Sequence, residues 1–564
     1  MAQTITDRVN EAGAVQVRPR PFPAVAERVL IIGLDGATFD VLNPLMAEGR
    51  MPRLAGAVTD GASGVLHSTV PPITPAAWTT FLTGTGPGRH GILDFERYDV
   101  ATNTLQFNST RVLGGVRNLW QILGDWGLRV GSINVPMTYP PVPVNGFLIS
   151  GFETPGPDSD FVYPPELKNE ILERWRDPTL GTRWRHATFG GSALFEENVA
   201  YMSRSFHQGA DMTTTLGDRL GWDVLMVVLK LVDNLQHKTW KHIDPRWSSR
   251  SPRRAEIVKR AFGELDKAVG ALLDYAAGKG AAVLIVSDHG HGSLEGKVQP
   301  NLLLRDWGYL KLESAGSRAL ARVANKWNRL GGRRRKFVRG DPLKYDCAVD
   351  FSATRACVMH AGMAGFLYVN LRGRQPCGVV APQDYESLRD ELEARFLSPD
   401  CQGVDPRGNT INLFKEVLKP EALYGCTRDE QPWMPDLILV PHESLAAVRK
   451  IRGSRPVQWL PYRRIEGTHR PEGILIAAGP GIARGRSVEA NIVDCAPTLL
   501  VMLGMRIPDD MQGRVVEDLF EEPPVIGHES VRAAERTEAG GGEAYSEQEL
   551  AEVTARLTDL GYLQ

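Results

Sequence analysis

The chain has 564 residues, of which 42% are hydrophobic and 23% charged, and its formal net charge at pH 7 is −2. This composition is ordinary for a folded globular protein, and the length suits one large core with insertions, or two to three domains. The near-zero net charge gives no global case for a nucleic-acid polymer or an anionic membrane surface as a partner.

The chain shows no targeting or disulfide signature. Its six cysteines form no CxxC pair, so disulfides are not required and a reducing, cytoplasmic compartment is the simpler prediction. Residues 1–27 are polar and then punctuated by prolines, which predicts a flexible lead-in. The longest apolar runs, such as residues 224–229, are far too short for a transmembrane helix.

Apolar runs that alternate with helical patterns dominate the chain. A run that is apolar at every position predicts a strand buried on both faces, as in a parallel sheet. We therefore predict an α/β fold with a mostly parallel central sheet and helices on both faces. The predicted strands are residues 28–33, 130–135, 223–229, 282–287, 436–440 and 474–478, and the predicted helices are residues 115–127, 165–177, 196–220 and 254–278.

The segment 301–432 differs from the rest because it is richer in loops and charge. We predict that it is an inserted subdomain, with a strand at 365–371, a helix at 382–396 and a solvated basic loop at 333–336. The catalytic core would then comprise residues 28–300 and 433–520. Residues 521–545 have the polar, low-complexity composition of a disordered linker, and residues 546–564 have the apolar spacing of a terminal helix.

Two candidate site residues come early in the chain. Asp35 follows the first predicted strand, and ligands collect at the carboxyl ends of strands in open α/β sheets. It suits a metal ion, although an Asp that caps the next helix is the alternative. Thr74 precedes Pro75, which predicts a helix with Thr74 as its N-cap. A hydroxyl at a helix N-terminus can act as a nucleophile toward a phosphoryl group bound there.

Asp233 and His237 follow another apolar strand and are four residues apart. On a helix this spacing places both side chains on one face, where they can hold one ion, although a surface Asp–His pair is the alternative. His469 lies in a predicted loop before the strand at 474–478, and it would complete a second nitrogen-rich site, although an exposed side chain is the alternative.

Asp288 and His289 stand together at the end of the predicted strand 282–287. Both can turn toward one metal if the backbone kinks, which Gly290 and the glycine at position 292 would permit. His291 is interpreted as an added substrate contact or an exposed side chain.

Together these segments supply three carboxylates, three imidazoles and one hydroxyl. Carboxylates and imidazoles without thiolates favour Zn²⁺, with Mn²⁺ as an alternative, whereas Ca²⁺ and Mg²⁺ prefer oxygen ligands alone. Two such ions about 4 Å apart can stabilise the attacking and leaving oxygens of a phosphoryl transfer.

The order of these residues resembles the alkaline phosphatase superfamily, and in particular the type I phosphodiesterase / nucleotide pyrophosphatase family. The resemblance covers roughly residues 28 to 520 and implies an alkaline-phosphatase-like fold and a small phosphoester or nucleotide substrate. The phrases that carry it are residues 74–84, 87–92, 287–290, 467–469, 494–500 and 511–514.

The resemblance also implies a role for each candidate residue. Thr74 would attack phosphorus and form a covalent phospho-threonine, which water then hydrolyses. One divalent ion would be held by Asp35, Thr74, Asp288 and His289, and the other by Asp233, His237 and His469.

One departure concerns the substrate. Nucleotide pyrophosphatases usually carry an Asn shortly after the His-Gly-Ile phrase, whereas here the chain continues through Asp94 to Phe95. A phosphomonoesterase or phosphonate hydrolase using the same site is therefore an alternative. A non-enzymatic metal-binding scaffold is the alternative from another class. A sulfatase is disfavoured because the Cys-x-Pro-x-Arg type of motif is absent.

Overall fold

The computed structural model describes residues 18–109, 115–175, 192–313, 349–428, 430–530 and 545–560. Four predicted segments lie wholly or partly outside the described residues. They are the first part of the lead-in, the basic run at 333–336, most of the linker and the last four residues of the terminal helix. The chain divides into two compact units. The first unit lies within residues 1–94, 109–293 and 466–563, and the second within 95–108 and 294–465. The predicted insertion at 301–432 is therefore one part of a larger second unit.

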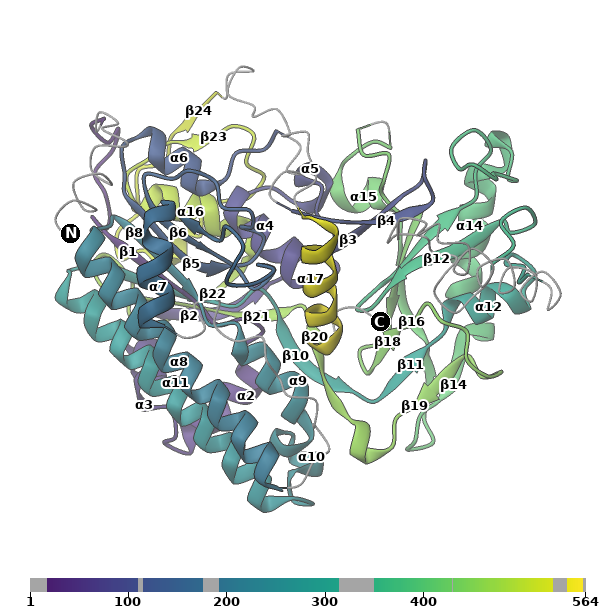
Figure 1. Ribbon diagram of the computed structural model, residues 1–564, viewed down its shortest axis with the longest axis horizontal. Coiled ribbons are helices and arrows are strands. Elements are labelled where there is room, and N and C mark those ends of the chain that lie inside the picture. Colours follow the sequence, from purple (N-terminus) through teal and green to yellow (C-terminus); the bar gives the residue numbers. More distant parts are fainter. Residues whose placement is uncertain are drawn as a thin grey trace. The chain divides into compact units, whose positions relative to one another are not determined.

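A nine-stranded sheet forms the centre of the first unit (Figure 1), and most of its neighbouring strands run parallel. This confirms the predicted α/β fold class. The segment predicted as a strand at 474–478 belongs to this sheet, but it runs antiparallel to both of its neighbours. In spatial order the strands are β22 (Arg486–Asn491), β2 (Ala62–His67), β21 (Glu472–Ala478), β9 (Ala282–Val286), β1 (Val29–Gly33), β8 (Val224–Val228), β5 (Val130–Val135), β6 (Gly146–Ser150) and β7 (Val162–Tyr163).

The central strands are covered on both faces, which is why their sequences are apolar at successive positions. On one face, Val29 and Ile31 of β1 share an apolar cluster with residues of α4 (Thr74–Thr83), α6 (Leu119–Asp125) and α16 (Cys495–Met502). On the other face, α8 (Ser192–Leu220) approaches β8 so closely that a Cβ added at Gly217 would lie 3.0 Å from a methyl group of Leu225. Helix α11 (Pro252–Gly278) packs beside α8 on that face (Figure 1).

Four further elements position the site. Helix α9 (Leu231–Ile243) follows β8, as the Asp-xxx-His spacing predicts. Helix α4 begins at Thr74, but its N-cap is Ile73, so the prediction that Thr74 is the N-cap is wrong by one position. Strand β20 (Glu466–Arg470) pairs with β10 (Gly290–Leu294), and His469 therefore lies on a strand instead of in the predicted loop.

The second unit has its own four-stranded antiparallel sheet, in the order β12 (Ala356–Ala361), β13 (Gly365–Val369), β17 (Leu437–Pro441) and β16 (Phe414–Leu418). The segment 436–440, predicted as a strand of the central sheet, forms β17 here instead. Its apolar run could not distinguish the two sheets, because β17 is also largely buried. The predicted helix at 382–396 is confirmed as a short 3₁₀ turn and α14 (Tyr385–Phe396).

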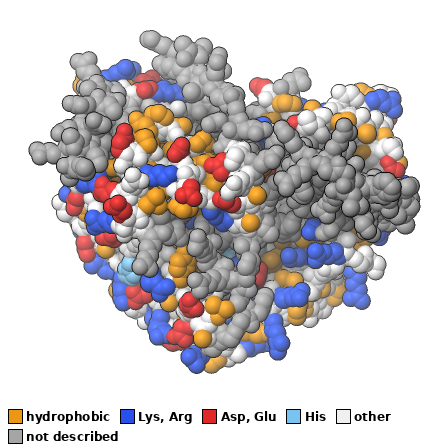
Figure 2. Space-filling model, viewed as in Figure 1, with side chains coloured by type: hydrophobic (Ala, Val, Ile, Leu, Met, Phe, Trp, Pro, Cys, Tyr) orange, Lys and Arg blue, Asp and Glu red, His pale blue; other side chains and the backbone are white. Residues whose placement is uncertain are grey.

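Near the C-terminus, β24 (His528–Glu529) pairs with β23 (Ile507–Pro508) inside the segment predicted as a linker. Helix α17 (Glu547–Leu560) lies within the predicted terminal helix. Among the described residues no helix combines the length and the apolar character that crossing a membrane requires. Figure 2 shows acidic and basic side chains interspersed over the helices of the first unit, in keeping with the small net charge. The cytoplasmic compartment stays a prediction.

Candidate metal centre

The carboxyl ends of three adjacent parallel strands bring the candidate carboxylates together. Gly33, the last residue of β1, pairs with Val286 of β9 and with Val228 of β8, so the three strands end at one level. Asp35 follows β1, Asp288 follows β9, and Asp233 lies in the first turn of the helix after β8. This is the edge at which open α/β sheets bind their ligands.

The hydroxyl of Thr74 lies beside these carboxylates. Its Oγ1 is 3.3 Å from Nε2 of His289, and both residues are completely buried. One turn further along α4, the indole Nε1 of Trp78 donates a hydrogen bond of 3.1 Å to Oδ2 of Asp35. The start of α4 is therefore tied both to the segment after β1 and to the segment after β9.

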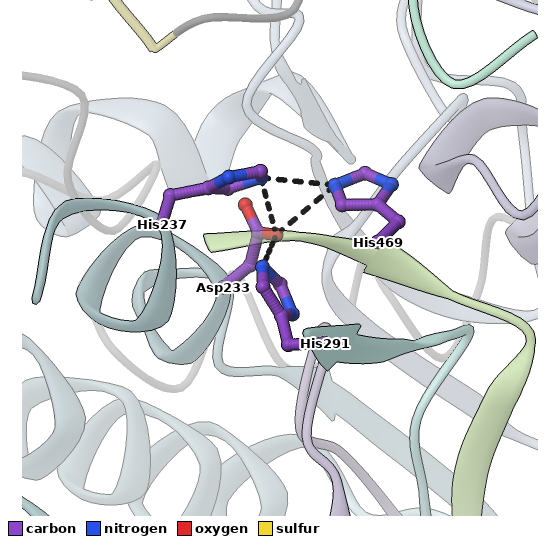
Figure 3. Close-up of side chains that lie close together, drawn as sticks. All are labelled: Asp233, His237, His291 and His469. Atoms are coloured by element: carbon purple, nitrogen blue, oxygen red, sulfur yellow. Dashed lines mark hydrogen bonds and ion pairs between the residues drawn. The ribbon is translucent and has the colours of Figure 1, made fainter. Parts of the chain in front are cut away.

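Four side chains from three elements converge in the first cluster, which we call the Asp233 cluster (Figure 3). It consists of Asp233, His237, His291 and His469. Oδ1 of Asp233 is 3.1 Å from Nε2 of His237 and 3.4 Å from Nε2 of each of the other two imidazoles. Nε2 of His237 lies 2.9 Å from Nε2 of His469.

A backbone carbonyl oxygen faces Nδ1 of each histidine in the site. The distances are 2.8 Å for His237, 2.9 Å for His469, 2.9 Å for His291 and 3.1 Å for His289. A carbonyl oxygen can only accept, so each Nδ1 carries a hydrogen, and a metal ion would bind each ring through the lone pair of its Nε2. Metal-binding histidines are oriented in this way in proteins.

A second cluster, the Asp35 cluster, joins Asp35, Asp233 and His289. Asp288 lies at its edge. Its Oδ1 accepts a hydrogen bond of 3.0 Å from the backbone N–H of Gly36, and its Oδ2 is 3.3 Å from Nε2 of His289. The two clusters share Asp233, as neighbouring metal sites often share a carboxylate.

A buried lysine that the sequence analysis did not select lies between the carboxylates. The Nζ atom of Lys230 is 3.4 Å from Oδ1 of Asp35 and 2.5 Å from Oδ2 of Asp233, and it lies 5.0 Å from the centre of the Phe152 ring. Burial by itself would lower the pKa of Lys230, but Asp233 and Asp35 outweigh burial and raise it. Lys230 is therefore a fixed positive charge in the site.

One ammonium does not balance three buried carboxylates. Burial, followed by the charge of Asp288, raises the pKa of Asp35 well above its usual value. Burial also raises the pKa of Asp288 to about 7. Burial would raise the pKa of Asp233 as well, but His237 and Lys230 lower it well below the usual value. Further positive charge would allow all three carboxylates to ionise, which is what a divalent cation supplies.

Three of the imidazoles resist protonation in this environment. Burial lowers the pKa of His289 to about 3, and burial together with the neighbouring His289 lowers the pKa of His469 to about 3. Burial also lowers the pKa of His291 well below its usual value. Neutral imidazoles with converging lone pairs, next to carboxylates, are the donor set that Zn²⁺ and Mn²⁺ accept. The residues present therefore fit divalent metal ions.

The structure brings all seven predicted site residues into this centre and adds His291 and Lys230. His291 could have been recognised from its position two residues after His289, because side chains two apart on an extended chain share one side. Gly290 and the glycine at position 292 both lie on β10, and neither has a positive φ. A Cβ at Gly290 would lie 2.0 Å from the carbonyl oxygen of Glu472, so this glycine permits a close strand approach.

Position 36 needs a glycine for two reasons. Its φ of +68° suits glycine, and a Cβ there would lie 2.6 Å from the His291 ring.

Two solved structures resemble this chain over most of its length. Phosphonoacetate hydrolase from Sinorhizobium meliloti 1021 shares 15% identity and a TM-score of 0.51, over 86% of this chain and 97% of that chain. Human ectonucleotide pyrophosphatase/phosphodiesterase 5 shares 14% identity and a TM-score of 0.46, over 88% of this chain and 100% of that chain. The first of these likenesses is one of fold, and it agrees with the predicted alkaline-phosphatase-like architecture. No curated protein matches this chain in sequence.

The model of one protein family matches most of the chain. The family is described as type I phosphodiesterase / nucleotide pyrophosphatase, and the match extends over residues 29–472. That range includes every residue of the two clusters. The chain belongs to the type I phosphodiesterase / nucleotide pyrophosphatase family.

Proposed function

We propose that this protein is a metal-dependent phosphoric ester hydrolase that acts on small phosphodiesters or nucleotides, with Thr74 as its nucleophile. Membership of the family supports the hydrolase class. The observation that carries the finer assignment is the position of the Thr74 hydroxyl. It lies at the first residue of α4 and 3.3 Å from His289, beside the Asp35 cluster.

The start of α4 suits a phosphoryl group as well as a nucleophile. The first backbone N–H groups of a helix have no partner within the helix, and they lie at the positive end of its dipole. They can therefore hold an anionic phosphoryl oxygen next to Thr74. The hydrogen bond from Trp78 to Asp35 fixes the carboxylate that faces this helix.

Divalent ions held by the two clusters, with Zn²⁺ favoured and Mn²⁺ as the alternative, would lower the pKa of the attacking hydroxyl and neutralise charge on the phosphoryl group. Oγ1 of Thr74 would attack phosphorus, and the bond to the leaving alcohol oxygen would break. The hydroxyl proton would leave with the alcohol, and a phospho-threonine would remain. Water would then cleave the bond from phosphorus to Oγ1, releasing a phosphate monoester and restoring Thr74.

The experiment is hydrolysis of bis-p-nitrophenyl phosphate beside p-nitrophenyl phosphate and phosphonoacetate, with Zn²⁺- or Mn²⁺-loaded protein. Thr74→Ala protein and EDTA-treated protein are the controls. A diester rate well above the other two, lost in both controls, is the expected result. A faster monoester or phosphonate rate would transfer the assignment to a phosphomonoesterase or phosphonate hydrolase.

Absence of turnover with all three compounds, together with fewer than two metal ions per chain, would favour the non-enzymatic scaffold.

A further inference from the structure

His291 is placed like the metal-ligand candidates around it. It is completely buried on β10, and its Nδ1 donates a hydrogen bond of 2.9 Å to the carbonyl oxygen of Gly36. The opposite nitrogen, Nε2, has no hydrogen-bond partner among the described residues. A buried polar atom without a partner is unfavourable, so a ligand is expected at that position.

The direction of this lone pair identifies the ligand. Nε2 of His291 lies 3.4 Å from Oδ1 of Asp233, the same distance that separates this oxygen from Nε2 of His469 (Figure 3). All four ligand atoms of the Asp233 cluster lie within 4.8 Å of one another. Bonds of about 2.0–2.1 Å to one tetrahedral ion place its ligand atoms roughly 3.3 Å apart. The spacing therefore suits a single divalent cation.

We propose that His291 is a fourth protein ligand of the ion held by Asp233, His237 and His469. The family resemblance assigns only those three residues to this ion. The surroundings of His291 are built to hold it in this position. Gly36 lacks the Cβ that would collide with its ring, and the Trp240 ring lies nearly parallel to it with the ring centres 6.1 Å apart.

The fourth ligand gives the two metal sites different donors, because three imidazoles surround this ion whereas the Asp35 cluster has one. Four protein ligands surround an ion more completely than the three that catalytic zinc sites usually provide. The Asp233 cluster therefore binds its ion more tightly than the Asp35 cluster, which has fewer imidazoles. A chelator will remove the ion of the Asp35 cluster first. This inference rests on the metal-binding part of the proposed function, and it does not depend on turnover.

The test counts coordinated imidazoles in full-length protein loaded with Co²⁺. An imidazole that binds Co²⁺ through Nε2 shows one strongly shifted, solvent-exchangeable proton signal from its Nδ1–H. With one equivalent of Co²⁺ per chain we expect three such signals, from His237, His291 and His469. With two equivalents we expect a fourth signal, from His289. His291→Gln protein should lose one signal, whereas the matched control His242→Gln, a change on α9 outside both clusters, should retain all of them.

Chelator competition provides the second readout. His291→Gln should weaken binding of the tighter ion at least tenfold, with the weaker ion changed much less, and His242→Gln should change neither. Only three signals from fully loaded wild-type protein would overturn the proposal, even if His291→Gln failed to fold. Unchanged affinity in folded His291→Gln protein would overturn it as well. Phosphoesterase activity that persists in Thr74→Ala protein would reject Thr74 as the nucleophile, and a full signal count in the same protein would still support this proposal, so the two hypotheses fail separately.

Discussion

Nε2 of His237 and Nε2 of His469 lie 2.9 Å apart, although the Nδ1 atom of each ring faces a backbone carbonyl oxygen. When both rings are neutral, this tautomer leaves a lone pair at each Nε2 and no hydrogen between the two atoms. A cation between the two atoms removes this repulsion. The carbonyl oxygens of Gly467 and Pro72 thus hold the two rings so that each Nε2 faces the position of the ion.

Removal of metal should therefore destabilise the protein. A ligand present at a thousandfold excess over its Kd stabilises the folded state by about 4 kcal/mol. EDTA-treated protein is expected to unfold at a lower temperature than protein supplied with Zn²⁺ or Mn²⁺, and re-addition of the ion should restore the original Tm. Calorimetry checks this. An identical Tm with and without metal, at matched ionic strength, would contradict it.

Substitution of Thr74 should separate chemistry from binding. Thr74→Ala removes the attacking oxygen, and we expect the turnover number to fall by about 10³-fold or more. Thr74→Ser retains a hydroxyl and should keep measurable activity. Metal content, measured by mass spectrometry, should stay close to the wild-type value in Thr74→Ala, since the carboxylates and imidazoles remain. Activity of Thr74→Ala within tenfold of the wild type would exclude Thr74 as the nucleophile.

Lys230 should matter most when metal is absent. Its ammonium is the positive charge between Asp35 and Asp233, and loss of one partner of a buried ion pair costs about 3–5 kcal/mol. Lys230→Met is expected to lower the Tm of EDTA-treated protein more than that of metal-loaded protein, because bound ions would replace the lost charge. Equal decreases in the two states would show that Lys230 acts by packing alone.

Gly36 and Gly49 provide a matched pair of substitutions. Both have positive φ, +68° and +70°, but an added Cβ meets the His291 ring at Gly36 and nothing within 4 Å at Gly49. Gly49→Ala should cost only the backbone strain, about 1–2 kcal/mol. Gly36→Ala should cost more and should also lower metal content, because His291 must move. Chemical denaturation and metal analysis of both variants check this, and equal effects would contradict it.

Glu153 should make stability depend on pH. Burial raises its pKa to about 7 from an ordinary value of 4.5, although backbone N–H groups of Thr138 and Tyr139 donate to it. A raised carboxyl pKa stabilises the fold below pH 4.5, and this contribution is lost as the pH rises through 7. The difference between pH 4.5 and pH 8 amounts to about 3 kcal/mol.

Glu153→Gln keeps an acceptor for the two N–H groups without ionising, so its stability relative to the wild type should rise between pH 5 and pH 8. Urea denaturation at each pH provides the measurement, and comparison at equal pH cancels the titration of other groups. A constant difference between the two proteins across this range would be inconsistent with a pKa near 7.

The sequence by itself was sufficient for the α/β class, because strands buried on both faces and amphipathic helices leave periodic patterns. It also predicted Asp35, Asp233 and Asp288 at strand ends, where the topology of a parallel sheet makes the side chains converge. Local spacing placed Asp233 and His237 on one helical face. These features depend on short stretches of chain, so a sequence can reveal them.

Only the tertiary structure decided the rest. The segment 436–440 has the apolar pattern of a central strand, and long-range pairing alone placed it in the second sheet. His469 became a strand residue because β20 pairs with β10. His291 joined the centre because β10, which carries it, pairs with β20, and Lys230 joined it because β8 ends at the same level as β1. Pairing partners are set by contacts between residues that lie tens to hundreds of positions apart, and local periodicity carries no record of them.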